Sequence, residues 1–280
     1  MKNDQRLPGR RALLRLAAGL GTAGAVRVIA ADPAGAPFRP AAELPEGSAG
    51  PPAVRRELPS AHRLQPMTAG SPPRFRPAAP PVRTRPFEKL SEIGHAMVLT
   101  FDDGPDPLYT PRILATLRKY DVRAMFFVCG GMADENPDLV RAIAGDGHTI
   151  GNHSWTHPLV TRLSRAGVRD ELGTTSEVIE KITGTPPFWY RAPYGAWNRN
   201  SFEIGAELGM EPMAWTLDTL DWTEPGAGTI VRRVRKGAAP GVVVLSHDAG
   251  GNRSQSVSAL RRYLPELLDE GYRITVPRRR

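Results

Sequence analysis

Acidic and imidazole side chains recur at the ends of apolar runs in this sequence. Asp102 and Asp103 follow the run MVLTF, His153 and His157 stand four residues apart in NHSWTHP, and His247 ends the run VVVLSH. Two imidazoles and one carboxylate can bind zinc or a similar divalent ion and leave coordination positions open for water and substrate. We therefore predict a catalytic metal site formed by Asp103, His153 and His157.

The remaining members of this set suit proton transfer. Adjacent carboxylates repel each other, and a cation bound to Asp103 would leave Asp102 free to take a proton from water, with Arg191 orienting it. His247 suits general-acid work near neutral pH, and Asp221 would set its tautomer. A surface turn is the alternative for the DDGP segment, because each of these residue types favours turns.

Side chains so far apart in the chain must be brought together by regular elements. Seven apolar runs predict strands at 97–101, 122–129, 148–153, 188–191, 212–217, 242–247 and 272–276. Stretches with apolar residues three and four apart predict helices at 110–120, 165–183, 201–208 and 255–270.

Strands that alternate with helices predict a parallel sheet. We expect an α/β fold: a distorted, shortened (β/α) barrel with about seven parallel strands. An open doubly wound sheet is less favoured, because no glycine-rich phosphate loop follows the first strand. The carboxyl ends of barrel strands converge on one face, so Arg191, Asp218 and Asp221 are expected beside the carboxylates and histidines.

The basic charge of the chain lies almost entirely in its first third. Residues 1–86 contain 14 Lys and Arg against 5 Asp and Glu, whereas residues 87–280 contain 23 against 24. A nearly neutral domain lacks the basic face that a phosphate backbone requires, so we do not expect a nucleic-acid partner.

Three regions are expected along the chain. Residues 1–31 combine the Arg10–Arg11 pair with a moderately apolar stretch, which predicts a cleavable export signal, and the arginine pair resembles that of a twin-arginine signal. An amphipathic or anchoring helix is the alternative. Residues 32–86 are rich in proline and predict a disordered tether. Residues 87–280 are expected to form the catalytic domain of a secreted or cell-wall associated protein, with no stable membrane span once the signal is removed.

Five motifs in order resemble the polysaccharide deacetylase family, also called the NodB homology domain or carbohydrate esterase family 4. They are TFDDGP (100–105), HSWTH (153–157), RAPYG (191–195), DTLDW (218–222) and LSHD (245–248), and the similarity covers 96–276. Any one motif is modest evidence, whereas the ordered set is highly specific.

The resemblance implies a role for each motif residue. Asp102 is implied as the base, Asp103, His153 and His157 as the metal ligands, and His247 as the acid. Arg191 would orient Asp102, Asp221 would pair with His247, and the backbone N–H of Tyr194 would stabilise the oxyanion. Trp222 and Leu245 would line the acetyl pocket, with ordinary core packing as the alternative for both.

The expected activity is metal-dependent removal of N-acetyl groups from an amino-sugar polymer, peptidoglycan or chitin-type oligomers, with release of acetate. An O-acetyl esterase acting on acetylated xylan is the alternative, and a noncatalytic sugar-binding barrel would have lost the ligands or the acid that are present here. Zinc is the expected ion, with cobalt, nickel or manganese as alternatives. The expected partner is the acetylated polysaccharide, and a monomer is expected.

Overall fold

Strand β1 (Ala96–Asp102) lies at the centre of the sheet in the computed structural model, which describes residues 79–277. All seven of its residues are buried. It pairs in parallel with β2 (Met125–Val128) on one side and with β7 (Val243–His247) on the other. The predicted export signal and most of the predicted tether lie outside the described residues, so these two regions remain predictions.

The sheet continues outward from β1 in both directions, and its pairs are parallel. Beyond β2 come β3 (Thr149–Asn152), β4 (Trp189–Tyr190) and β5 (Glu211–Pro212). Beyond β7 comes β6 (Leu217–Asp218), and β8 (Arg273–Ile274) pairs with the start of β1. This arrangement confirms the distorted, shortened (β/α) barrel.

The prediction of one strand at 212–217 is wrong, because this segment forms parts of two strands at opposite edges of the sheet. Met213 N–H donates to the carbonyl of Tyr190 on the β4 side, whereas Thr216 N–H donates to the carbonyl of Val243 on the β7 side. The chain therefore changes partners between these two residues. No β5–β6 pairing is present in the described sheet, so the barrel is open at this seam.

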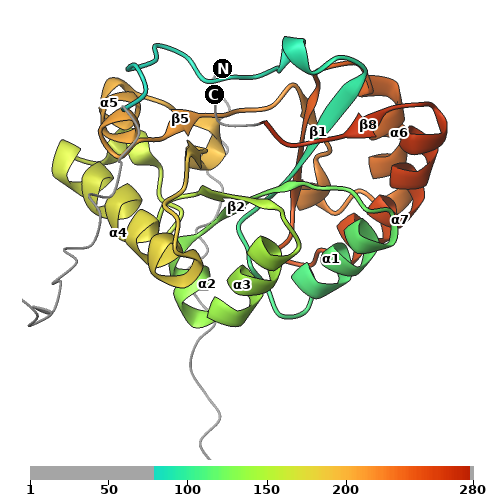
Figure 1. The fold of residues 1–280 in the computed structure, drawn as a ribbon, viewed down its shortest axis with the longest axis horizontal. Helices are drawn as coiled ribbons and strands as arrows, with labels where there is room; N and C mark the ends of the chain where they lie inside the picture. The colour runs from blue at the N-terminus through green and yellow to red at the C-terminus, as the bar shows by residue number, and fades with distance from the viewer. Residues whose placement is uncertain (1–78, 278–280) are drawn as a thin grey trace, which may run out of the picture. The chain divides into compact units, whose positions relative to one another are not determined.

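Seven α-helices are described, and they surround the strands (Figure 1). They are α1 (Thr110–Lys119), α2 (Gly130–Glu135), α3 (Pro137–Gly145), α4 (Arg165–Thr183), α5 (Arg199–Glu207), α6 (Ala227–Gly237) and α7 (Ser254–Asp269). Short 3₁₀ turns occur at Ser91–Ile93, Val160–Arg162, Pro193–Gly195 and Asp221–Thr223. The four predicted helices are confirmed with small shifts at their ends. The sequence pattern did not predict α2 and α3, which are short, or α6, whose buried residues are only Ile230, Val231 and Val234.

Alternate residues of β1 face two different cores, as the two-residue period of a strand requires. Met97, Leu99 and Phe101 belong to the large cluster that includes helix residues such as Leu117 and Leu260. Val98 belongs to the enclosed cluster with Met125, Phe127, Trp189, Met213 and Val243. Thr100 and Asp102 continue the Val98 face toward the carboxyl end of the barrel.

The segment before β1 is attached to the domain at the opposite end of the strands. Phe87 N–H donates to the carbonyl of Pro212, and Leu90 N–H donates to the carbonyl of Gly241. Phe87 and Leu90 also pack against the enclosed cluster. Within the predicted tether, Arg83 forms a two-point ion pair with the Glu211 carboxylate, at 2.8 Å and 2.7 Å. This segment therefore covers the amino-terminal end of the barrel.

Candidate active site

Asp102 and Arg191 form a buried ion pair at the carboxyl ends of β1 and β4. Arg191 Nη1 donates to Asp102 Oδ1 at 2.7 Å and to Thr100 Oγ1 at 2.7 Å. Its Nε and Nη2 donate to the carbonyls of Met213 and Ala214 at 3.1 Å and 2.8 Å. Burial lowers the pKa of Arg191, and Asp102 acts in the opposite direction. A buried guanidinium is stable only with such partners, and its hydrogen bond holds the Asp102 side chain in one orientation.

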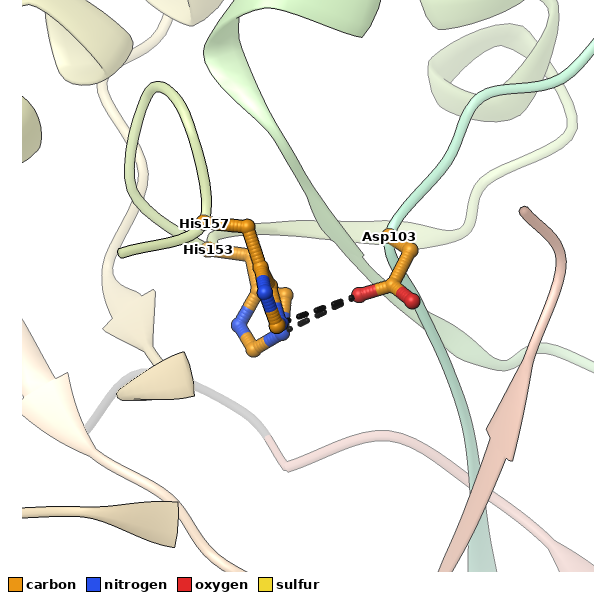
Figure 2. Close-up of side chains that lie close together, drawn as sticks. All are labelled: Asp103, His153 and His157. Carbon is orange, nitrogen blue, oxygen red and sulfur yellow. Dashed lines mark ion pairs between the residues drawn. The ribbon is translucent and has the colours of Figure 1, made fainter. Parts of the chain in front are cut away.

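Asp103, His153 and His157 face one another beside this pair (Figure 2). The Nε2 atoms of His153 and His157 lie 3.5 Å and 3.3 Å from Asp103 Oδ1. One donor atom from each of the three residues lies within 4.8 Å of the other two. Asp103 and His157 both have positive φ, 77° and 58°, which turns their side chains toward the shared centre at the ends of their strands.

The hydrogen bonding of these groups fits a divalent cation. His153 Nδ1 lies 2.8 Å from the carbonyl of Arg191, which can only accept, so Nδ1 carries a proton and Nε2 is the ring nitrogen that faces Asp103. Asp103 Oδ1 is buried and has no hydrogen-bond partner among the described residues. Two imidazoles with a carboxylate are a donor set that zinc accepts.

The surroundings of this centre lower the pKa values of both Asp103 and His157. Burial acts to raise the pKa of Asp103, but the interaction with the nearby imidazoles, that of His153 first, outweighs it and lowers the value to about 2. Burial, followed by the charge of His153, lowers the pKa of His157. A carboxylate and a neutral imidazole are the forms that bind a metal ion, so these shifts favour ligation.

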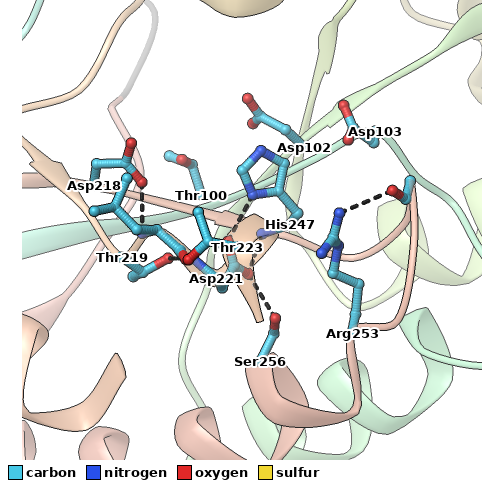
Figure 3. Close-up of polar contacts among 12 residues, drawn as sticks. Thr100, Asp102, Asp103, Asp218, Thr219, Asp221, Thr223, His247, Arg253 and Ser256 are labelled. Atoms are coloured by element: carbon cyan, nitrogen blue, oxygen red, sulfur yellow. Dashed lines mark hydrogen bonds and ion pairs between the residues drawn. The ribbon is translucent and has the colours of Figure 1, made fainter. Parts of the chain in front are cut away.

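His247 and Asp221 form the second polar pair of the site (Figure 3). His247 Nδ1 lies 2.7 Å from Asp221 Oδ1, and the backbone N–H of His247 donates to Asp221 Oδ2 at 2.9 Å. Ser256 Oγ donates to the same oxygen at 2.6 Å. Asp221 is therefore held at three points, and it fixes the Nδ1–H tautomer of His247.

The Asp221 carboxylate favours the protonated form of His247. Burial acts to lower the pKa of His247, but the hydrogen bond and charge of Asp221 raise it to about 9. Burial acts to raise the pKa of Asp221, and the hydrogen bond from His247 outweighs it, so that this pKa is lowered. In the sheet register His247 is the direct neighbour of Asp102. The His247 ring therefore lies at the same end of the sheet as the carboxylates of Asp102 and Asp103.

The three predicted substrate-contacting residues differ in exposure. Tyr194 and Trp222 are 68% and 53% exposed, two of only four large hydrophobic side chains that are exposed in the described region. The Tyr194 ring meets the edge of the His157 ring, with centroids 4.6 Å apart. Leu245 is buried and precedes His247 by two residues on the same face of β7. This position fits both a pocket floor and core packing, so its role remains a prediction.

The sequence did not predict a place beside the site for the carboxylates of Asp248 and Glu171. Asp248 is buried, and its Oδ2 accepts a 2.5 Å hydrogen bond from Thr110 Oγ1. Burial raises its pKa to about 7. Asp248 is the last residue of the LSHD motif, so the motif could have indicated its position near the site. Glu171 lies in α4 and accepts hydrogen bonds from the loop between the two histidines. Its position in a predicted helix did not indicate this contact.

Known proteins are similar over the region that forms this site. The family profile described as polysaccharide deacetylase matches residues 91–213. A peptidoglycan-N-acetylglucosamine deacetylase of Bacillus cereus is 37% identical over 65% of this chain and 66% of its own length. A chitooligosaccharide deacetylase of Rhizobium leguminosarum bv. trifolii is 36% identical over 67% of this chain and 92% of its own length. The chain thus spans slightly less than two thirds of the first of these relatives.

Solved structures share the fold. A peptidoglycan N-acetylglucosamine deacetylase in complex with a substituted N-hydroxybenzamide superposes with a TM-score of 0.66 at 35% identity, covering 68% of this chain and 89% of the other. A carbohydrate esterase family 4 pseudoenzyme of Bacillus anthracis gives a TM-score of 0.65 at 31% identity, covering 69% and 67%. Because a pseudoenzyme has this fold, the residues of the site must decide whether this chain is active.

Proposed function

Because the chain belongs to the polysaccharide deacetylase family, we propose that it removes N-acetyl groups from a cell-wall or extracellular amino-sugar polymer and releases acetate. Peptidoglycan and chitin-type oligomers are the proposed substrates, since the named relatives include deacetylases of both kinds. The enzyme class follows from the relatives, and the choice of polymer is our proposal.

One observation carries the proposal of activity. The strand ends bring together a possible metal site, a carboxylate held by a buried arginine, and an imidazole whose pKa is raised by a buried carboxylate. Amide hydrolysis needs all three: stabilisation of the oxyanion, a base for the attacking water, and an acid for the poorly leaving amine. The fold by itself does not require this combination of a metal site, a base and an acid.

We propose a separate role in amide hydrolysis for each residue of the site. Asp103, His153 and His157 would hold a divalent ion, for which zinc is the proposed identity, and the ion would supply polarisation of the acetamide carbonyl and of water. Asp102, oriented by Arg191, accepts a proton from water. His247 donates its Nε2 proton to the departing sugar nitrogen, and Asp221 keeps that imidazole protonated before the step. The backbone N–H of Tyr194 is proposed as a further donor to the oxyanion, and Trp222 and Leu245 as the lining of the acetyl pocket.

The location of the protein is also a proposal. Some of the named relatives are deacetylases of peptidoglycan, a cell-wall polymer, and an export signal is predicted for residues 1–31. In the described part of the chain, no helix combines the length and the apolar character needed to cross a membrane. We propose a secreted or wall-associated monomer.

Acetate release tests the proposal. The full-length chain is incubated with N-acetylglucosamine oligomers, peptidoglycan and acetylated xylan, each with chelator and with added zinc. We expect release from at least one amino-sugar polymer, lost with chelator and restored by zinc. His247→Asn should lower the rate about 10²- to 10⁴-fold, as expected for loss of a general acid. The matched control is His95→Asn, at an exposed histidine just before β1, at the opposite end of that strand from Asp102.

Release from xylan alone would replace the proposal with the O-acetyl esterase. Release that resists the chelator would argue against the metal site, and full activity of His247→Asn would argue against the assigned acid. No release from any of the three polymers would contradict the proposed activity.

A further inference from the structure

The loop between the two histidines has a constrained backbone. Ser154 and His157 have φ values of 65° and 58°, a region that residues with a side chain adopt only where their surroundings hold them. The two imidazoles extend from this segment toward Asp103 (Figure 2). The conformation of residues 154–156 therefore sets how closely the two rings converge.

Two elements hold one side of this loop. At the start of α2, the backbone N–H groups of Gly130 and Gly131 donate to the carbonyls of Ser154 and Trp155, at 2.9 Å and 3.2 Å. The side-chain oxygen of Asn152, at the end of β3, accepts from the N–H of Ser154 at 2.8 Å. These contacts satisfy two carbonyls and one N–H, and leave the next two N–H groups for another partner.

A single carboxylate of α4 satisfies those two groups. Glu171 Oε2 accepts from the N–H of Trp155 at 2.7 Å and from the N–H of Thr156 at 2.8 Å. Glu171 Oε1 accepts from Thr156 Oγ1 at 2.7 Å. Neither N–H lies in a strand or helix, so no regular backbone hydrogen bond satisfies it. The carboxylate of Glu171 is the acceptor for both.

We infer that Glu171 is a positioning residue for the metal centre: it fixes the loop so that His153 and His157 converge on Asp103. The inference rests on the metal site of the proposed function and adds a residue that lies outside the five motifs. Partners that orient metal ligands typically change metal affinity 10- to 100-fold when they are removed. Without Glu171, two loop N–H groups lose their acceptor and the two rings are free to separate.

Zinc affinity of the metal-free full-length protein, measured by competition with a chromogenic chelator, tests this role. Glu171→Ala removes all three hydrogen bonds and should weaken zinc binding about 10- to 100-fold. Glu171→Gln can place its amide oxygen at the Oε2 position and its NH₂ group against Thr156 Oγ1, so it should stay within about threefold of the wild type. Glu177→Ala, at an exposed glutamate of the same helix, is the matched control and should bind normally.

Glu171→Asp separates geometry from charge. Aspartate keeps the negative charge but is shorter by one methylene, so it cannot reach both N–H groups and should weaken zinc binding as alanine does. For a role limited to holding the loop, kcat of Glu171→Ala should return to within about threefold of the wild type at saturating zinc. Circular dichroism of the metal-free variants checks that each is folded.

Normal zinc affinity of a folded Glu171→Ala would overturn the inference. Equal losses for Glu171→Gln and Glu171→Ala would also overturn it, because charge rather than hydrogen-bond geometry would then matter. If Glu171→Ala does not fold, the comparison of Gln with Asp decides: normal binding by Gln with weak binding by Asp supports the inference, and equal affinities overturn it. Absence of zinc binding by the wild type would instead be a failure of the proposed function.

Discussion

The ionised side chains at the strand ends are arranged in pairs of opposite charge. Arg191 is fully buried against Asp102, and Asp221 is buried against His247. Removing one member leaves the other as a buried charge without compensation, which is costly. Each pair is therefore expected to respond as a unit to mutation, and an Arg191→Lys change would lose contacts because lysine lacks the planar set of donors.

The His247–Asp221 pair predicts a shift in pH dependence. Burial lowers the pKa of His247 and Asp221 raises it to about 9, so the acid is protonated at neutral pH and loses its proton as the pH rises through that value. Asp221→Asn removes the raising contribution. The alkaline limb of kcat/KM should therefore move to lower pH, and kcat at pH 7 should fall. Rates measured from pH 5 to 10 check this.

Asp218→Asn is the control for the Asp221 substitution, because Asp218 is only partly buried and accepts from the backbone N–H of Leu220 rather than from His247. It should leave the alkaline limb near its wild-type position. An alkaline limb that does not move in Asp221→Asn would mean that Asp221 does not control the protonation of His247.

At the scale of the elements, two helical glycines show what packing requires. In α5, a Cβ on Gly205 would lie 2.3 Å from the ring of Tyr190, which is fully buried and donates to the carbonyl of Ser201. In α4, a Cβ on Gly173 would meet nothing within 4 Å. The first glycine allows close packing of α5 on β4, and the second only adds flexibility to its helix.

Alanine substitutions should therefore act in opposite directions at these glycines. Gly205→Ala should lower the free energy of unfolding by about 1–3 kcal/mol, because the buried Tyr190 ring must move. Gly173→Ala should raise it by about 0.5–1 kcal/mol, because alanine favours the helix. Urea unfolding of the two variants measures both changes. A stabilising Gly205→Ala would contradict the close contact between α5 and β4.

The whole molecule depends on contacts between segments that are far apart in the chain. β1 and β7 are direct neighbours although about 140 residues separate them. The segment around Phe87 connects two separate parts of the sheet, because Phe87 binds Pro212 at the end of β5 and Leu90 binds Gly241, just before β7. Arg83 extends this attachment by its ion pair with Glu211 on β5.

The Arg83–Glu211 pair predicts that the domain extends before residue 87. The Glu211 side chain is 9% exposed, whereas that of Arg83 is 37% exposed, so the expected loss is smaller than for a fully buried pair. Arg83→Ala should lower the free energy of unfolding of the full chain by about 1–2 kcal/mol. Arg85→Ala, at an exposed arginine two residues later, is the control and should change it by less than about 0.5 kcal/mol. Equal stability of the two variants would show that the pair does not stabilise the domain.

Much of the site could be predicted from local features of the sequence. The HSWTH spacing and the adjacent aspartates after an apolar run indicated a metal site, and the alternation of strands and helices indicated the parallel barrel. The residues named for these reasons do lie together: Asp103 with both histidines, Asp102 with Arg191, and Asp221 with His247.

Other features depend on which distant segments pack together. The split of 212–217 between two sheet edges follows from the partners available to each backbone group, and these lie on β4 and β7. In the sequence, Glu171 cannot be distinguished from the other polar residues of its helix. Its contact with the loop between His153 and His157 exists only because α4 packs beside that loop. Local patterns report the hydrophobicity and turn preference of short segments. A long-range hydrogen bond requires two segments to meet, and only the folded arrangement determines where they do.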